Sequence, residues 1–263
     1  MKIGYFQFSP TIGDTEQNRR RLVEAVLQTD ADLLVAPELA TSGYFFASTE
    51  QARELSEPIP GPTTDALCEV SAKTGCTVVT GLPERAGNIL YNSAVVVGPN
   101  GIIGTYRKIH LFNEEKIHFT PGEEGFFSFD LNGVKVGVLV CFDHMFPEAA
   151  RSLALQGVQI VCHPSDLVLP EYGQLTSRVR ALENRMFWIL ANRWGNEEVG
   201  EKALTYTGVS QVVNPRGRIL IKADAAADDL SAVEINPDES LNKNVTHYNH
   251  LLDDRRPEFY FIR

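Results

Sequence analysis

Short runs of Val, Ile, Leu and Phe recur along this chain of 263 residues and alternate with amphipathic stretches. Residues 2–8 alternate as a strand does, and 15–29 show helical spacing behind a capping Asp14. Residues 32–37 (DLLVAP) then form a short, mostly apolar run, as in a buried strand. This β-α-β start favours an α/β layered fold over a helical bundle or a pure β-sandwich.

The same alternation continues through most of the chain. We expect helices over 63–74, 147–156 and 174–185, and a loop over 109–124. Strands are expected near 76–82, 91–97, 158–163 and 187–192, with hairpins at 98–108, around Asn132-Gly133 and around 214–217. Since no linker or repeat interrupts the pattern, we expect a single domain over 1–263. Within it, 240–263 is an irregular tail that packs on the domain or reaches a neighbour in an assembly.

The charge balance restricts the partners. With 24 basic and 34 acidic residues the net charge is −10, and the basic residues are scattered, so neither nucleic acid nor an anionic membrane is an expected partner. No apolar run approaches the roughly 18 residues of a membrane helix, and the N-terminus lacks the pattern of a signal peptide. We therefore expect a cytoplasmic protein that binds a small molecule.

Cysteine and histidine spacing bears on covalent links and metals. The four cysteines have irregular spacing and no C-x-x-C pair, so free thiols are expected in a chain large enough not to need disulfides; they are Cys68, Cys76, Cys141 and Cys162. No H-x-x-x-H or H-E-x-x-H pattern occurs among the histidines, which include His110, His118, His144 and His163. Neither a metal ion nor another cofactor is expected.

Three reactive side chains stand where apolar strands end. Glu38 follows the run at 32–37, and Cys141 and Asp143 follow the strand after Asn132-Gly133. Ligand sites of α/β sheets lie outside the carboxyl ends of strands. A turn and a helix near Pro147 would place backbone N–H groups around the Cys141 sulfur and lower its pKa. The alternative is a buried structural thiol, which suits the other three cysteines better.

Glu38 and Lys108 each allow two interpretations. Glu38 is either a cap or ion-pair partner, or a partly desolvated general base. Lys108, at a strand end, is either a solvated lysine or a fixed cation that holds the oxyanion of a tetrahedral intermediate. The residue types alone leave both questions open.

Taken together, the motifs resemble the nitrilase superfamily, or carbon-nitrogen hydrolases, and their ordered set is far more specific than any one of them. The matching segments are APELATSGY (36–44), GLPER (81–85), LYNSAVVV (90–97), YRKIHLF (106–112), EKIHFTPG (115–122), VLVCFDHMFPE (138–148), HPSDLV (163–168), RALENRMFWILANR (180–193) and DRRPEFY (254–260). The resemblance covers nearly the whole chain.

The resemblance implies a catalytic set of four side chains. Its glutamate falls on Glu38, its lysine on Lys108 and its cysteine on Cys141. A second glutamate falls on Glu115, with Glu114 as the alternative one position away. The backbone N–H of Phe142 is the implied partner of Lys108 at the oxyanion; the segments also suggest a small pocket with an aromatic wall, lined by Tyr44, Phe45, Phe112, His118, His144 and Asp166.

The resemblance also implies a fold and an activity. The fold is a four-layer α-β-β-α sandwich, commonly paired into a homodimer or larger homo-oligomer. The activity is hydrolysis of a non-peptide carbon–nitrogen bond by an amidase-like enzyme, with a small aliphatic amide converted through a cysteine thioester to a carboxylic acid and ammonia. The alternatives are a nitrilase, an N-carbamoyl amidohydrolase and, from another class, a binding protein without turnover.

Overall fold

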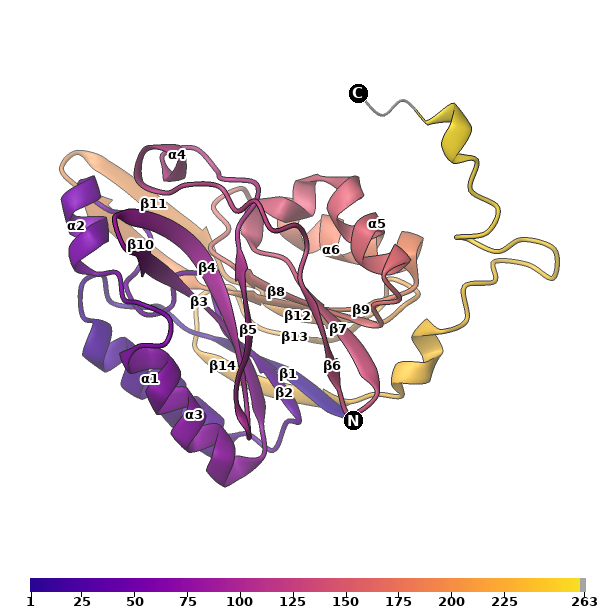
Figure 1. The fold of residues 1–263 in the computed structure, drawn as a ribbon, viewed down its shortest axis with the longest axis horizontal. Helices are drawn as coiled ribbons and strands as arrows, with labels where there is room; N and C mark the ends of the chain where they lie inside the picture. Colours follow the sequence, from indigo (N-terminus) through magenta and orange to yellow (C-terminus); the bar gives the residue numbers. More distant parts are fainter. Residues whose placement is uncertain (261–263) are drawn as a thin grey trace.

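The computed structural model describes residues 1–260 and consists of two six-stranded sheets that face each other. Helices α1 (Thr15–Gln28) and α3 (Pro62–Thr74) cover one outer face, and α5 (Pro147–Leu155) and α6 (Tyr172–Asn184) cover the other (Figure 1). The expected α-β-β-α sandwich is therefore confirmed. None of the described helices combines the length and apolar character needed to span a membrane.

The first sheet contains the β-α-β start of the chain. In spatial order its strands are β14 (Asp229–Glu234), β1 (Lys2–Gln7), β2 (Leu33–Val35), β3 (Thr77–Ala86), β4 (Ile89–Gly98) and β5 (Gly101–Arg107). Strands β1, β2 and β3 run parallel, and the other pairings are antiparallel. Asp14 caps α1 through the backbone N–H of Gln17, as its sequence position predicts.

The second sheet repeats this arrangement. In spatial order its strands are β13 (Ile219–Lys222), β12 (Gln211–Val213), β9 (Phe187–Asn192), β8 (Ile160–Ser165), β7 (Val134–Val138) and β6 (Ser128–Leu131). Strands β7, β8 and β9 run parallel, and β6 and β7 form the hairpin predicted at Asn132-Gly133. Asn132 and Gly133 both have positive φ, as a tight hairpin of this kind requires.

The main hydrophobic core lies between the two sheets. Side chains such as Val35 and Val79 from the first sheet pack in one cluster with Ile160 and Ile189 from the second. Because the apolar inner faces set the spacing of the sheets, residues just beyond the carboxyl ends of the parallel strands lie close together at one edge of the sandwich. The candidate site residues lie at this edge.

Several short elements were not predicted from the sequence. They are α2 (Thr49–Glu54), α4 (Glu115–His118), β14 and the separate hairpin of β10 (Trp194–Val199) and β11 (Lys202–Thr207). Helix α4 lies inside the segment expected to be a loop and has only four residues. The β10–β11 hairpin is rich in polar residues and belongs to neither large sheet, so its sequence lacks the apolar alternation of a strand that covers a core.

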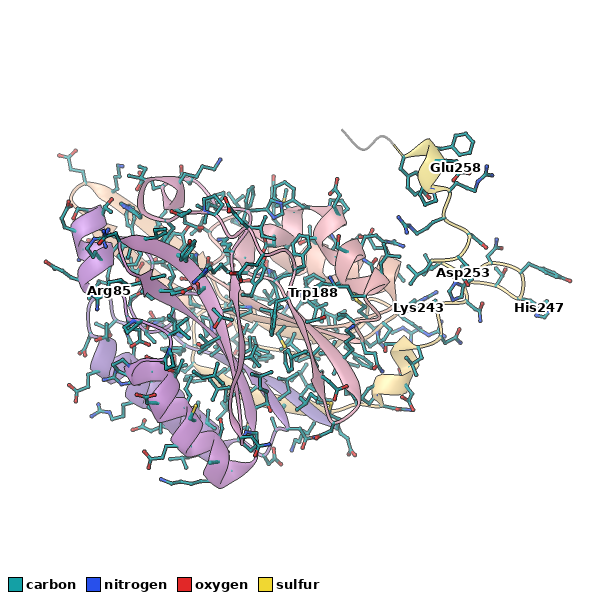
Figure 2. The ribbon with its side chains drawn as sticks, in the orientation of Figure 1. Arg85, Trp188, Lys243, His247, Asp253 and Glu258 are labelled. Carbon is teal, nitrogen blue, oxygen red and sulfur yellow. The ribbon has the colours of Figure 1, made fainter. Side chains whose placement is uncertain are left out.

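Beyond β14 the chain leaves the body of the sandwich. After the short turns of η2 (Pro237–Ser240), residues 241–260 extend outward and include η3 (Pro257–Phe259) (Figures 1 and 2). Lys243 anchors the start of this tail by donating to the carbonyls of Asn184 and Arg185. Of the expected tail at 240–263, the last three residues lie outside the described part.

We predict that Gly81→Ala destabilises the edge of the first sheet where the candidate site residues lie. A Cβ at Gly81 would lie 2.5 Å from the Glu38 Cα and the Leu39 N, both backbone atoms that cannot move aside easily. Overpacking of this kind costs about 1–3 kcal/mol. Gly98→Ala in the same sheet is the control, because its Cβ would meet mainly the flexible end of Ile103. Equal free energies of unfolding for the two variants in chemical denaturation would contradict this explanation.

Candidate active site

Glu38 lies just beyond β2 with its side chain fully buried between the sheets. Its Oε1 accepts hydrogen bonds from the Lys108 ammonium at 2.7 Å and from the Asn92 amide at 2.6 Å. Its Oε2 accepts from the backbone N–H of Asp166 at 3.1 Å, so both sheets hold the same carboxylate. This carboxylate has one orientation and little freedom to move.

Lys108 follows β5 and is also fully buried. Its Nζ donates to Glu38 Oε1 and to Glu115 Oε1, at 2.7 and 2.8 Å. Burial favours the neutral amine, but the adjacent Glu115 and Glu38 carboxylates outweigh it and raise the pKa of Lys108 well above its usual value. Lys108 is therefore a fixed cation and not a solvated surface lysine.

Glu115 begins α4 and completes this group of charges. Besides Lys108, its carboxylate accepts from the Tyr44 hydroxyl at 2.7 Å and from the backbone N–H of Phe112 at 3.2 Å. Burial raises its pKa, although Lys108 opposes the shift. The neighbouring Glu114 instead pairs with Lys202 away from the group, so of the two alternatives the structure brings Glu115 to Lys108.

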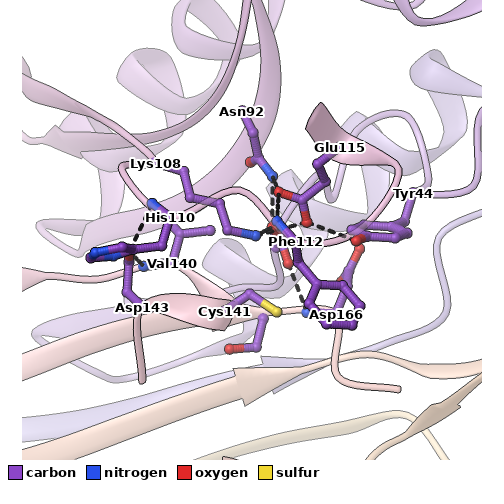
Figure 3. Close-up of polar contacts among 12 residues, drawn as sticks. Tyr44, Asn92, Lys108, His110, Phe112, Glu115, Val140, Cys141, Asp143 and Asp166 are labelled. Atoms are coloured by element: carbon purple, nitrogen blue, oxygen red, sulfur yellow. Dashed lines mark hydrogen bonds and ion pairs between the residues drawn. The ribbon is translucent and has the colours of Figure 1, made fainter. Parts of the chain in front are cut away.

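Cys141 begins the short 3-10 turn η1 (Cys141–Met145), separated from the end of β7 by Leu139 and Val140. Its φ of 41° lies in the left-handed region, which a non-glycine residue adopts only when its surroundings hold it there. The sulfur points toward the backbone N–H of Asp166 (Figure 3). Burial, reinforced by Glu38, raises the pKa of the thiol well above its usual value. This corrects the expectation of a lowered pKa, because desolvation outweighs the nearby cation and backbone dipoles.

Asp143 supports the turn that carries Cys141. Its Oδ2 accepts from the Val140 N–H at 2.9 Å and from the Tyr106 hydroxyl at 2.8 Å, while Oδ1 lies 2.7 Å from His110 Nδ1. The hydrogen bonds to this carboxylate thus come from the turn itself, at Val140, and from Tyr106 and His110 beside it. Asp143 therefore shapes the backbone at Cys141 and does not face the cavities.

His163 also supports this turn from β8. Its Nε2 lies 2.9 Å from the Cys141 carbonyl, and its Nδ1 accepts from the Trp188 indole N–H at 3.1 Å. With one nitrogen donating and the other accepting, the ring is neutral. Within residues 1–260 no three His, Cys, Asp or Glu side chains are grouped to hold a metal ion.

Two cavities adjoin the charged group and contain the residues predicted to contact a substrate. A cavity of about 330 Å³ has an aromatic wall that includes Tyr44, Phe112 and His118. A smaller one of about 20 Å³ borders Cys141 itself; it is lined by Phe112, Phe142, His144, Asp166 and Leu167 to Leu169. The Asp166 carboxyl is fully buried, and burial raises its pKa, so this side chain is less accessible than its motif suggests.

Other polar residues around the group were not identified from the sequence. Asn92 lies inside the matched segment at 90–97, yet only the structure shows its amide donating to Glu38. Arg193, Glu197 and Tyr206 form a second buried group behind Tyr44. The only indication in the sequence was the position of Arg193 at the end of a matched motif, since the β10–β11 hairpin was not predicted.

Comparison with known proteins bears directly on this arrangement. Residues 2–240 match the family model described as carbon-nitrogen hydrolase. The chain belongs to the carbon-nitrogen hydrolase family. The predicted family resemblance and the hydrolysis of a carbon–nitrogen bond by an enzyme are confirmed at this level.

Individual relatives match this carbon-nitrogen hydrolase over almost its full length. A nitrilase from Pyrococcus abyssi is 41% identical, with 99% of both chains covered. An (R)-stereoselective amidase from a Pseudomonas species is 35% identical, covering 97% of this chain and 92% of the relative. The fold also matches the solved structure of an amidase variant from Nesterenkonia sp. AN1, with a TM-score of 0.79 and 26% identity over 98% of this chain and 94% of the other. In that structure the acetamide moiety of fluoroacetamide is added covalently at the active-site cysteine.

We predict that two buried histidines make a contribution to stability that is lost as the pH falls from about 6.5 to 5. Burial lowers the pKa of His163 to about 3 and that of His144 to about 4, whereas an unfolded histidine titrates near 6.5. At these two side chains the unfolded chain binds more protons than the folded one in this range, so their contribution to the free energy of unfolding decreases as the pH falls. Each histidine contributes up to about 1.4 kcal/mol per pH unit.

Denaturant unfolding at a series of pH values measures this slope. His144→Asn should reduce it by about one proton's contribution, whatever the variant does to stability at pH 7. An unchanged slope would show that His144 is not buried in its neutral form.

Proposed function

We propose that this protein hydrolyses a small aliphatic amide to a carboxylic acid and ammonia through a thioester on Cys141. The main support is the convergence of a buried thiol with a lysine that two buried carboxylates hold in place. Because the Cys141 pKa is raised, the resting thiol keeps its proton, so attack on a carbonyl requires a base beside it. Glu38 is the proposed base.

In the first half-reaction the Cys141 sulfur bonds to the amide carbon while its proton passes to Glu38. The carbonyl oxygen becomes an oxyanion held by the Lys108 ammonium and the backbone N–H of Phe142. Glu38 then gives its proton to the nitrogen as the C–N bond breaks. Ammonia leaves, and the acyl group remains on the sulfur as a thioester.

In the second half-reaction water attacks the thioester carbon and transfers a proton to Glu38. The tetrahedral intermediate uses the same oxyanion donors, and its collapse breaks the C–S bond. Glu38 returns the proton to the sulfur, so the carboxylic acid leaves and the enzyme regains its starting state. Glu115 holds Lys108 in place and helps to orient the substrate or the attacking water.

The sizes of the two cavities favour a substrate with a small acyl group beside the sulfur. The cavity at Cys141 has a volume of only about 20 Å³ and is bordered by Phe112, Phe142 and aliphatic side chains. The larger cavity extends past Tyr44, Phe112 and His118 and gives room for the rest of a substrate. We propose these three residues together with His144 and Asp166 as the walls of the substrate site.

Nitrile hydrolysis is the second candidate function. The relative from Pyrococcus abyssi, named a nitrilase, is 41% identical to this chain, whereas the (R)-stereoselective amidase is 35% identical. The same nucleophile can add to a nitrile carbon or an amide carbon, and the shape of the pocket determines which substrate reacts. Ammonia release from matched aliphatic amides, ω-amides, nitriles and N-carbamoyl compounds distinguishes these activities.

We predict that Cys141→Ala abolishes ammonia release from every substrate while the thermal unfolding curve is retained. Mass spectrometry of the intact wild-type protein, quenched during turnover, should show the mass of the acyl group added at Cys141. Cys68→Ala is the control, because this half-exposed free thiol lies on α3, away from the site, and should keep full activity. Turnover by the Cys141 variant would refute the proposed nucleophile.

We also propose a homodimer, with helices α5 and α6 and the tail at the contact. Helix α6 exposes an apolar stripe at helical spacing, composed of Tyr172, Leu175, Val179 and Leu182. The tail adds Tyr248 and Phe259, which are 87% and 66% exposed. A second copy of this chain would remove both apolar surfaces from water. Since its four cysteines are free thiols, we further propose that it works in the reducing cytoplasm.

We predict that Leu175→Asp converts this dimer to a monomer, because a charge in the apolar stripe cannot be buried without a partner. Sedimentation velocity at micromolar concentration should show a dimer for the wild type and a monomer for the variant. Leu27→Asp on α1, which is similarly exposed on the opposite outer face, should remain a dimer. A monomeric wild-type protein would refute the proposed assembly.

A further inference from the structure

Glu197 forms a second buried ionic group, separate from the one at Lys108. Although β10 belongs to a mostly polar hairpin, the Glu197 carboxylate is buried. Its Oε1 accepts from Arg193 Nη1 at 2.6 Å, and its Oε2 accepts from the Tyr206 hydroxyl at 2.5 Å. The Arg193 guanidinium also lies 3.9 Å from the centre of the Tyr206 ring. Buried ion pairs add little net stability, so such a group is of interest mainly for what it orients.

The remaining hydrogen bonds of Glu197 go to the turn that contains Tyr44. The Phe45 N–H donates to Oε2 at 2.9 Å, and the Tyr44 N–H donates to the same oxygen at 3.2 Å. The turn packs so closely that a Cβ at Gly43, whose φ is 80°, would lie 2.6 Å from Glu197 Oε1. One carboxylate therefore determines where the backbone of residues 43–45 lies.

Tyr44 connects this turn to the charged group around Cys141. Its hydroxyl donates to Glu115 Oε1 at 2.7 Å, and the same oxygen accepts from Lys108 Nζ at 2.8 Å (Figure 3). A continuous series of contacts thus runs from Arg193 through Glu197 and Tyr44 to Glu115 and Lys108. Any displacement of the turn would move the phenol away from Glu115.

We propose that Glu197 is a positioning residue: it fixes the Tyr44–Phe45 backbone so that the Tyr44 hydroxyl holds Glu115 against Lys108. The proposal rests on the function proposed for Lys108 and Glu115. It gives the β10–β11 hairpin two roles, because Lys202, Ala203 and Leu204 from the same hairpin line the larger cavity. The hairpin therefore shapes the substrate cavity and also places a member of the charged group.

Glu197→Gln tests this proposal with little change in side-chain shape. An amide accepts through only one of its two polar atoms, so the bonds to Arg193, Tyr206 and the Tyr44 turn cannot all be kept. We expect kcat to fall by about 10-fold to 100-fold, the range for losing a hydrogen bond to a charged group. The matched control is Glu198→Gln, the next residue on β10, whose side chain is exposed and whose loss should leave kcat unchanged.

A second readout separates positioning from general stability. The pH dependence of Cys141 alkylation by iodoacetamide reports the charges around the thiol, because Glu38, Lys108 and Glu115 all act on its pKa. Glu197→Gln and Tyr44→Phe should shift the midpoint of this profile in the same direction, and the double variant should shift it no further than the larger single change. Glu198→Gln should keep the wild-type profile.

Additive shifts, or a wild-type alkylation profile in Glu197→Gln, would overturn the proposal, even if that variant unfolds at a lower temperature. If Glu197→Gln does not fold, Tyr206→Phe replaces it, because it removes one donor to Glu197 without changing charge. The same comparison with Tyr44→Phe then applies. Alkylation requires no turnover, so a wild-type protein inactive on all amides would refute the proposed function while this test still decides the role of Glu197.

Discussion

The contact of Lys108 with two carboxylates is the interaction on which the proposed catalytic edge of the sandwich depends. The buried Glu38 and Glu115 carboxylates share the Lys108 ammonium, and a neutral lysine would leave both without an ionic partner. Each member comes from a different element: Glu38 follows β2, Lys108 follows β5 and Glu115 begins α4. The ion pairs therefore close this edge of the first sheet as well as forming the site.

The second sheet contributes Cys141, the proposed nucleophile, and is connected to this group through backbone atoms. The N–H of Asp166, just beyond β8, donates to Glu38, and His163 from β8 lies within hydrogen-bonding distance of the Cys141 carbonyl. Since the apolar core sets the distance between the sheets, it also sets the distance from the thiol to Lys108. A change in core packing far from this edge can thus alter the distance between the Cys141 thiol and Lys108, because it alters the separation of the sheets.

The sequence predicted the main elements and the residues that now lie together, because both leave strong local patterns. Apolar periodicity marked β1, β8 and β9, and the motifs marked Glu38, Lys108 and Cys141. It could not predict the raised pKa of Cys141, which results from burial between two sheets rather than from residues near it in the chain. The role of Glu197 was missed for a similar reason, since its hairpin lacks apolar periodicity and its partners are distant in sequence.

The balance of buried charge explains why the thiol can keep its proton until a substrate arrives. Among residues 1–260, the buried carboxyl groups Glu38, Glu115, Asp143, Asp166 and Glu197 lie around the buried cations Lys108 and Arg193. Adding a thiolate would increase the excess of negative charge in a region with little water, and burial accordingly raises the pKa of Cys141, Glu115 and Asp166. In the proposed mechanism a substrate carbonyl changes this balance, because the developing oxyanion would lie against Lys108 while the thiol proton passes to a carboxylate. Negative charge then forms beside the Lys108 ammonium, which is already in place, so attack on the substrate is favoured over ionisation of the free thiol.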